Sequence, residues 1–194
     1  VRFLKQEYPD LVPNLSTAKS PQQMFGAVTK TYFAEKMGID PKKIFCVSVM
    51  PCTAKKYESD VPEVNSAGVG EDVDVVLTTR EIDRMLRASH INVAALKEEE
   101  FDSPLGSGTG AAVIFGATGG VMEAALRSAY FLITGKKPEA EAFTFIRGVE
   151  GVRHGTLNIN GIDVSVAATS GLANTRRLIE DVLAGKVHYD FIEI

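Results

Sequence analysis

The chain has 194 residues, 45% of them hydrophobic and 24% charged, so it can bury one sizeable core or two smaller ones. Its net charge of -4 and its scattered lysines and arginines exclude the basic surface that nucleic-acid binding requires. No apolar run approaches the length of a membrane span, and the two cysteines, Cys46 and Cys52, do not make a disulfide framework.

Two helices are expected before Pro41. Residues 1–8 carry apolar side chains at helical spacing and precede Pro9, as in the tail of a helix that began upstream. Ser20 is typical of an N-cap, with Pro21 at the first helical position and Gln23 reaching back as a capping box. This second helix is expected to end at a left-handed Gly38 and to bury Met24, Val28 and Tyr32.

Residues 44–50 form a β-branched and aromatic run that predicts a buried strand of an α/β sheet. Pro51 cannot donate to a ladder, so the chain turns at the carboxyl end of this strand, where open α/β sheets place their ligands. If the next turn is helical, Cys52 and Lys55 share a face, which places a sulfur beside a cation. On spacing alone, an inert cysteine and a solvated lysine remain the alternative.

The middle of the chain predicts a turn-rich surface connection over residues 59–72 and a second strand over residues 73–77. Thr78 and Glu81 form a capping box that opens a helix reaching about Ser89. His90 is expected at the surface or at a helix cap. The acidic run 97–100 is expected to be a solvated loop, because adjacent carboxylates repel one another.

Residues 105–110 are a Gly-rich approach to a predicted strand over residues 111–115, followed by a Gly-rich turn and a helix ending near Gly135. Such a turn offers backbone N–H groups and a helix N-terminus to an anion. A nucleotide phosphate loop is disfavoured, because the stretch lacks a Gly-Lys-Ser/Thr ending and Gly-x-Gly-x-x-Gly spacing.

The last third is expected to be scaffold. Residues 143–147 predict a short strand, and Asn160-Gly161 predicts a hairpin between strands 156–159 and 162–166. Gly171 leads into a helix that ends at Gly185, and residues 189–194 predict a last strand.

Three stretches together resemble the FeFe, or iron-only, hydrogenases, which interconvert protons and dihydrogen. They are Met50-Pro51-Cys52-x-x-Lys55-x-x-Glu58, residues 14–26 and residues 115–127, in the family's order. In the family a signature with two adjacent cysteines precedes the position of Val1, and a signature with two more cysteines begins at the Glu that Glu193 matches. The resemblance therefore implies that residues 1–194 are an internal piece of the large-subunit catalytic domain, truncated at both ends.

The implied fold class is α/β: a mixed twisted sheet flanked by helices, as one lobe, or one lobe plus part of a second, of the H-cluster domain. The implied cofactor is the H-cluster, in which a 4Fe-4S cluster held by four cysteines is bridged to a di-iron subcluster with CO, cyanide and dithiolate ligands. Cys52 matches one cluster ligand, which should bind as the thiolate.

Further site residues follow from the same resemblance. Lys55 matches the residue that pairs with a cyanide, Met50 packs near the bridging carbonyl, and Ser16 matches a hydroxyl on the proton path. Without the resemblance, Ser16 is an ordinary turn hydroxyl. Pro21, Gln22, Phe115 and Gly116 match residues that line the di-iron pocket.

The resemblance also implies partners: a ferredoxin or cytochrome electron carrier, the remainder of the hydrogenase chain, and a small subunit in some arrangements. The expected compartment is the cytoplasm, with the periplasm as the alternative. Because one ligand of four cannot hold a cluster, the isolated 194 residues are expected to bind no iron and to be inactive. The competing hypothesis is a non-catalytic iron–sulfur assembly scaffold, since those proteins share the Lys-Ser-Pro-Gln-Gln and Met-Pro-Cys-x-x-Lys stretches.

Overall fold

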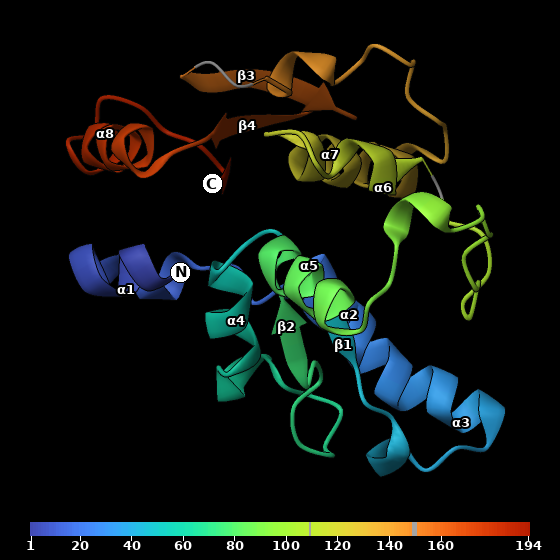
Figure 1. The fold of residues 1–194 in the computed structure, drawn as a ribbon. Coiled ribbons are helices and arrows are strands. Elements are labelled where there is room, and N and C mark those ends of the chain that lie inside the picture. Colours follow the sequence, from blue (N-terminus) through green and yellow to red (C-terminus); the bar gives the residue numbers. More distant parts are fainter. Residues whose placement is uncertain (109, 149–150) are drawn as a thin grey trace. The chain divides into compact units, whose positions relative to one another are not determined.

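The computed structural model describes residues 1–108, 110–148 and 151–194, and it divides the chain into two compact units, Val1–Gly106 and Ser107–Ile194 (Figure 1). Thr109, in the predicted Gly-rich approach, lies outside the described residues. The predicted α/β class is confirmed. The strands are divided between a parallel pair in the first unit and a mixed three-stranded sheet in the second. Within the described part of the chain, no helix is long and apolar enough to span a membrane.

The first unit contains one parallel strand pair and several short helices. Its elements are α1 (Arg2–Glu7), α2 (Pro21–Val28), α3 (Ala34–Met37), β1 (Val47–Val49), α4 (Ala54–Ser59), β2 (Val75–Leu77) and α5 (Thr79–Ala88). Strand β1 pairs with β2 in register Val47↔Val75 to Val49↔Leu77. Helix α4 lies in the crossover between these strands, so the chain after β1 returns by the helical connection that parallel pairing requires.

The strand predicted over residues 44–50 forms, but it is shorter and less buried than expected. Val47 and Val49 are exposed, and only Ser48 between them is half-buried. An apolar strand run is typical of a parallel strand covered on both faces. Among the described residues β1 pairs only with β2, and the Ser48 side chain donates a hydrogen bond to Gln22 of α2.

The helix predicted from Ser20 is confirmed in extent, because α2 continues through a π-helical turn, Thr29–Phe33, into α3 and ends at Gly38 with φ 65°. Its predicted buried face is wrong. Met24, Val28 and Tyr32 are all exposed. The buried face instead contains polar and small residues, namely Gln22, Gln23, Gly26, Lys30 and Ala34.

Contacts with the segment before β2 explain this reversal. A Cβ at Gly26 would lie 2.6 Å from the Asp72 carbonyl oxygen, so only a glycine lets the helix come this close. Lys30 is only 4% exposed, and its ammonium lies 2.7 Å from an Asp74 carboxylate oxygen and 2.6 Å from the Glu71 carbonyl oxygen. The helix is therefore held by charge and close backbone packing on its buried side.

The connection predicted over residues 59–72 lies mostly at the surface, as expected, and is anchored at its end by Asp72. The buried Asp72 carboxylate accepts hydrogen bonds from the Ser66 and Ala67 amides at 3.0 and 2.9 Å and from Lys19 at 2.9 Å. Burial raises the pKa of Asp72, but the bonds from Lys19 and from the two amides outweigh it and lower this pKa below its ordinary value.

Helix α5 begins as predicted, with both bonds of the Thr78–Glu81 capping box in place. His90 is exposed at φ 55°, and residues 97–100 are exposed, as expected.

The second unit packs helix α7 against its own sheet. Its elements are α6 (Ala111–Ile114), α7 (Gly120–Thr134), β3 (Val152–Ile159), β4 (Ile162–Thr169), α8 (Leu172–Leu183) and β5 (Phe191–Glu193). The predicted hairpin is confirmed: β3 and β4 are antiparallel with Ile159 opposite Ile162, and both Asn160 and Gly161 have positive φ. Strand β5 adds to β4 in parallel.

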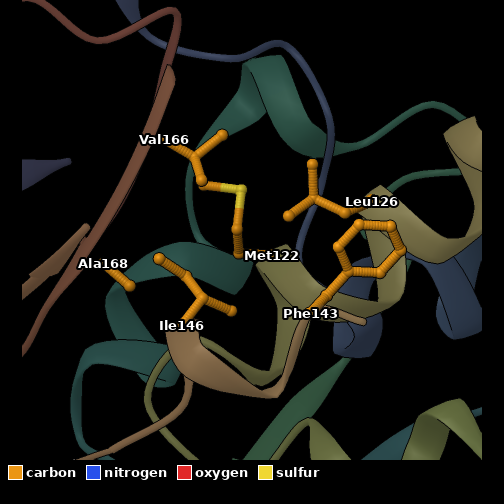
Figure 2. Close-up of a cluster of buried hydrophobic side chains, with 6 residues drawn as sticks. All are labelled: Met122, Leu126, Phe143, Ile146, Val166 and Ala168. Atoms are coloured by element: carbon orange, nitrogen blue, oxygen red, sulfur yellow. The ribbon is translucent and has the colours of Figure 1, made fainter. Parts of the chain in front are cut away.

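Figure 2 shows the core of this unit. Met122 and Leu126 of α7 point toward Val166 and Ala168 of β4, and Phe143 and Ile146 complete the cluster. Residues 143–147, predicted as a strand, contain a 3-10 helix, Thr144–Ile146. A three-residue turn brings Phe143 and Ile146 to the same side, whereas strand alternation would place them on opposite faces.

Candidate functional site

The carboxyl end of β1 carries the predicted cysteine and lysine. The Met50 amide donates to the Leu77 carbonyl at 2.9 Å, which is the last bond of the β1–β2 ladder before Pro51. The Lys55 amide then donates to the Cys52 carbonyl at 3.2 Å and closes a turn into α4. Cys52 is exposed. The predicted turn, with a thiol at the end of a strand and a lysine three residues later, is confirmed.

Lys55 forms an ion pair with Glu58, for which the sequence predicted no role. Its Nζ lies 2.7 Å from Oε2 of Glu58, and both side chains are about a quarter exposed, at 25% and 23%. The i,i+3 spacing on a helix was the available signal for this pair. The pair fixes the direction of the ammonium close to the Cys52 turn.

Gln22 connects three elements at this end of the strand. Its Oε1 accepts a hydrogen bond from Ser48 Oγ of β1 at 2.7 Å, and its Nε2 lies 3.5 Å from the Lys55 carbonyl oxygen of α4. Gln22 itself is buried in the first turn of α2, directly after Pro21. Ser48 was missed, although strand alternation places it on the opposite face from Val47 and Val49.

Gln23 departs from its predicted role. The Ser20 hydroxyl accepts the Gln23 amide at 3.4 Å, which confirms the N-cap, but the Gln23 side chain is fully buried and does not complete a capping box. Among the described residues, its Nε2 has no hydrogen-bond partner. A buried donor without an acceptor is costly, so this amide is an unsatisfied donor next to Gln22 in the first turn of α2.

A cleft of about 470 Å³ runs along β1 beside α2. Gln22, Ser48 and Met50 line it, and most of its remaining lining is apolar, including Phe25, Phe45 and Val73. Two of the residues expected from the sequence to contact a cofactor, Gln22 and Met50, therefore share one hollow, whereas Cys52 and Lys55 lie outside its lining.

The two cysteines differ in their surroundings. Cys46, at the other end of β1, is half-buried, and burial raises the pKa of its thiol. Lys30 opposes this effect, while the nearby Asp74 and Asp72 carboxylates add to it. The neutral thiol is therefore favoured at Cys46, and the exposed Cys52 is the accessible sulfur.

Ser16 lies in an exposed turn between α1 and α2, where its Oγ accepts the Ala18 amide at 3.1 Å. No hydrogen bond within the described ranges connects it with Cys52, Lys55 or Gln22. This geometry matches the turn hydroxyl that was the alternative for Ser16.

Phe115 and Gly116 follow α6 in the second unit. The strand predicted over residues 111–115 is wrong, because residues 111–114 are helical. Ala111 and Ala112 are strong helix formers, and a run this short has too little β-branched character to override them. Phe115 is exposed, and nothing lies within 4 Å of the space where a Gly116 side chain would begin. Within the described ranges, no group of three or more His, Cys, Asp or Glu residues could hold a metal ion.

Comparison with known proteins covers the whole chain. The family model for the iron-only hydrogenase large subunit, C-terminal domain, matches residues 1–194. The chain is 48% identical over 192 residues to the periplasmic Fe hydrogenase large subunit of Nitratidesulfovibrio vulgaris, spanning 99% of this chain and 45% of that protein. It is 42% identical to iron hydrogenase 1 of Clostridium pasteurianum, spanning 100% and 34%. A more distant relative, cytosolic iron-sulfur assembly component 3 of Pongo abelii, is 32% identical, spanning 95% and 40%.

Solved structures agree with these relatives. An apo single-residue variant of FeFe-hydrogenase HydA1 from Chlamydomonas reinhardtii superposes with a TM-score of 0.77 at 39% identity, over 99% of this chain and 55% of that one. The chain thus spans about half the length, or less, of the proteins it matches. A match over every residue, together with these identities, shows that the chain belongs to the family of iron-only hydrogenase large subunits, in their C-terminal domain.

Proposed function

We propose that residues 1–194 are an internal part of a hydrogenase catalytic domain, and that the full-length protein interconverts dihydrogen with protons and electrons at an H-cluster. The observation that carries the proposal is the exposed Cys52 thiol at the carboxyl end of β1, next to a lysine whose ammonium Glu58 holds at 2.7 Å. The 48% identity to a hydrogenase large subunit, against 32% to an assembly component, favours the enzyme.

The residues present fit one side of such a group. Iron–sulfur clusters are held by cysteine thiolates, and Cys52 offers an accessible sulfur. Anionic ligands require hydrogen-bond donors, and both the Lys55 ammonium and the unpartnered, buried amide Nε2 of Gln23 are donors. A single sulfur supplies one of the four ligands that a 4Fe-4S cluster takes, so the other ligands come from outside these residues.

Each residue has a defined task in this proposal. Cys52 holds the cluster iron as a thiolate, and Lys55 donates a hydrogen bond to an anionic ligand. Glu58 restricts the lysine to one direction before the group binds, which lowers the cost of ordering it. Gln22 ties the first turn of α2 to Ser48 and to the Lys55 backbone, so the pocket wall and the lysine are held together.

The remaining roles rest on the resemblance alone. By that resemblance, Met50, Pro21, Phe115 and Gly116 would line the di-iron group, and the Ser16 hydroxyl would pass protons between solvent and the site. When bound, the group supplies the irons at which hydrogen is made or split and through which electrons pass. A ferredoxin or cytochrome exchanges those electrons, in the cytoplasm or the periplasm.

The test is made on the full-length protein that contains this chain, after anaerobic maturation. We expect stoichiometric iron, infrared bands of CO and cyanide, and hydrogen evolution. Cys52→Ala should lose all three. The matched control is Cys46→Ala, which removes a half-buried thiol only six positions away and should keep the bands.

Two other outcomes would contradict the proposal. Iron without CO and cyanide bands would support a non-catalytic assembly scaffold, the function named for the more distant relative. Unchanged iron content and unchanged bands in Cys52→Ala would show that Cys52 is an inert cysteine and not a cluster ligand.

A further inference from the structure

Helix α7 receives its N-terminal cap from a residue far away in the sequence. Oε1 of Glu193 accepts a hydrogen bond from the Gly119 amide at 2.8 Å, and Oε2 accepts one from the Met122 amide at 2.6 Å. The first amides of a helix have no partner within it, and the positive end of the helix favours a carboxylate. One oxygen thus satisfies the Met122 amide, which an N-cap side chain would ordinarily serve, and the other satisfies the amide of the N-cap residue Gly119 itself.

The turn before α7 cannot supply that cap itself. Gly119, at the N-cap, has φ 81°, and a Cβ there would lie 2.1 Å from the Ile146 carbonyl oxygen. A Cβ at Gly120 would lie 1.7 Å from the Ile114 carbonyl oxygen. Backbone packing on two sides therefore requires glycine at both positions, and a glycine has no side chain to accept a hydrogen bond.

The backbone of Glu193 is held in place by strand pairing. It lies in β5, where it is opposite Ala168 of β4, and Ala168 is fully buried. Because the sheet fixes the backbone of Glu193, the hydrogen bonds of its carboxylate hold the turn 117–120 at a set distance from the sheet edge. The Gly148 amide, which donates to the Thr118 carbonyl at 3.1 Å, holds the same turn from the segment after the 3-10 helix.

The stretch just before this turn is open. Nothing lies near the Cβ position of Gly116, and Phe115 is exposed. The stretch is attached at one end to the short helix α6 and at the other to the clamped turn. Its place is consequently set by the turn, and the turn by Glu193.

We infer that Glu193 is a positioning residue whose carboxylate holds residues 115–118 at the edge of the β3–β4–β5 sheet. The contact of these residues with the di-iron unit rests on the proposed function. Glu193 does not touch the reacting atoms. It acts through the amides of Gly119 and Met122.

The experiment uses two variants of the full-length protein. Glu193→Gln keeps the shape and one acceptor oxygen, while Glu193→Ala removes both acceptors. In the apo-protein, amide hydrogen exchange at Gly119 and Met122 should accelerate by about tenfold or more in Glu193→Ala and by less in Glu193→Gln. Exchange at Val166 and Ala167 in β4 should not change. Glu141→Gln, at an exposed carboxylate in the same unit, is the matched control.

The second readout is the infrared spectrum after maturation. We expect the CO and cyanide bands to shift or broaden in Glu193→Ala and to return toward the wild-type positions in Glu193→Gln. Unchanged amide exchange rates at Gly119 and Met122 in Glu193→Ala would show that the Glu193 carboxylate does not hold these amides, and would overturn the inference. Faster exchange with unchanged bands would reduce Glu193 to a structural cap and would also overturn the inference. If the wild-type protein showed no CO and cyanide bands, the proposed function would be wrong, and so would the positioning role. The exchange data would then still show whether Glu193 caps α7.

Discussion

Glu81 and Thr78 together fix the start of helix α5 and link it to helix α4. The Glu81 carboxylate accepts the Thr78 amide and the Thr78 hydroxyl, each at 2.8 Å, and lies 2.9 Å from the Lys56 ammonium. Since α5 follows β2 directly and Lys56 belongs to α4, this carboxylate joins the two helices that flank the strand pair. The capping box was visible in the sequence, whereas the Lys56 contact was not, because it joins residues 25 positions apart.

The same contacts predict an acid-sensitive helix start. The backbone bond from Thr78, then the bonds from Lys56 and the Thr78 hydroxyl, lower the pKa of Glu81 from 4.5 to about 2. A depressed folded-state pKa stabilises the fold above pH 4.5, and this contribution is lost as the pH falls toward about 2. Carboxyl-carbon NMR should give a titration midpoint near 2 for Glu81.

A matched pair of variants checks the cause. Thr78→Val removes the hydroxyl but keeps the backbone bond, so the midpoint should rise part of the way toward 4.5. Thr79→Val, at the exposed neighbouring position, should leave it in place. A wild-type midpoint near 4.5 would show that the capping contacts are not formed in solution.

At the scale of elements, α2 is placed by its contacts and not by its apolar side chains. The sequence pattern predicted where the helix begins and ends, since Ser20, Pro21 and Gly38 act locally. It could not predict which face is buried. Lys30 is buried because Asp74 and the Glu71 carbonyl meet it, and those partners lie 41 or more positions away. A periodicity rule that counts apolar residues assigns the opposite face.

The close approach at Gly26 makes a direct prediction. Gly26→Ala would place a methyl group 2.6 Å from the Asp72 carbonyl oxygen and 2.8 Å from Val73 Cγ2, which forces α2 away from the strand pair. Alanine favours a helix interior by about 1 kcal/mol, but overpacking costs about 1–3 kcal/mol, and displacement of Lys30 from Asp74 adds to the loss. We expect urea unfolding to show a net loss of about 1–2 kcal/mol. Gly108→Ala, where nothing surrounds the added methyl, is the control, and an equally stable Gly26→Ala would refute the close packing.

At the scale of the whole molecule, the chain consists of two units that meet in sequence at Gly106 and Ser107. Residues 97–106 before this boundary are exposed and contain no helix or strand, and Phe101 is 97% exposed. Exposed irregular segments are where proteases cut folded proteins first. Brief chymotrypsin treatment should therefore cleave after Phe101 before any other site. Phe101→Ser should abolish this first cut, and an initial cut inside β3 or β4 would contradict the division.

The α/β class, the hairpin at Asn160-Gly161 and the turn that presents Cys52 follow from local signals, and the structure confirms them. The two strand predictions that failed have different causes. Residues 111–114 are helical because Ala111 and Ala112 favour a helix, whereas residues 144–146 form a single 3-10 turn that lets Phe143 and Ile146 pack in the core. The role of Ser48 was missed because it depends on which residue of α2 lies beside the strand, whereas the pairing of Glu58 with Lys55 was missed although their i,i+3 spacing indicated it. The roles of Cys52, Ser16, Met50, Pro21, Gln22, Lys55, Phe115 and Gly116 remain predictions.

The contact between Glu193 and α7 also has a consequence during protein synthesis. Glu193 is made 71 residues after Met122, whose amide it caps. At about 5–20 residues per second, the ribosome needs roughly 4–14 s to cover that distance. For those seconds the Gly119 and Met122 amides lack the Glu193 carboxylate, and β4 lacks β5 beside it. The second unit therefore cannot complete its fold before β5 emerges, and in the meantime its apolar surface is open to chaperones.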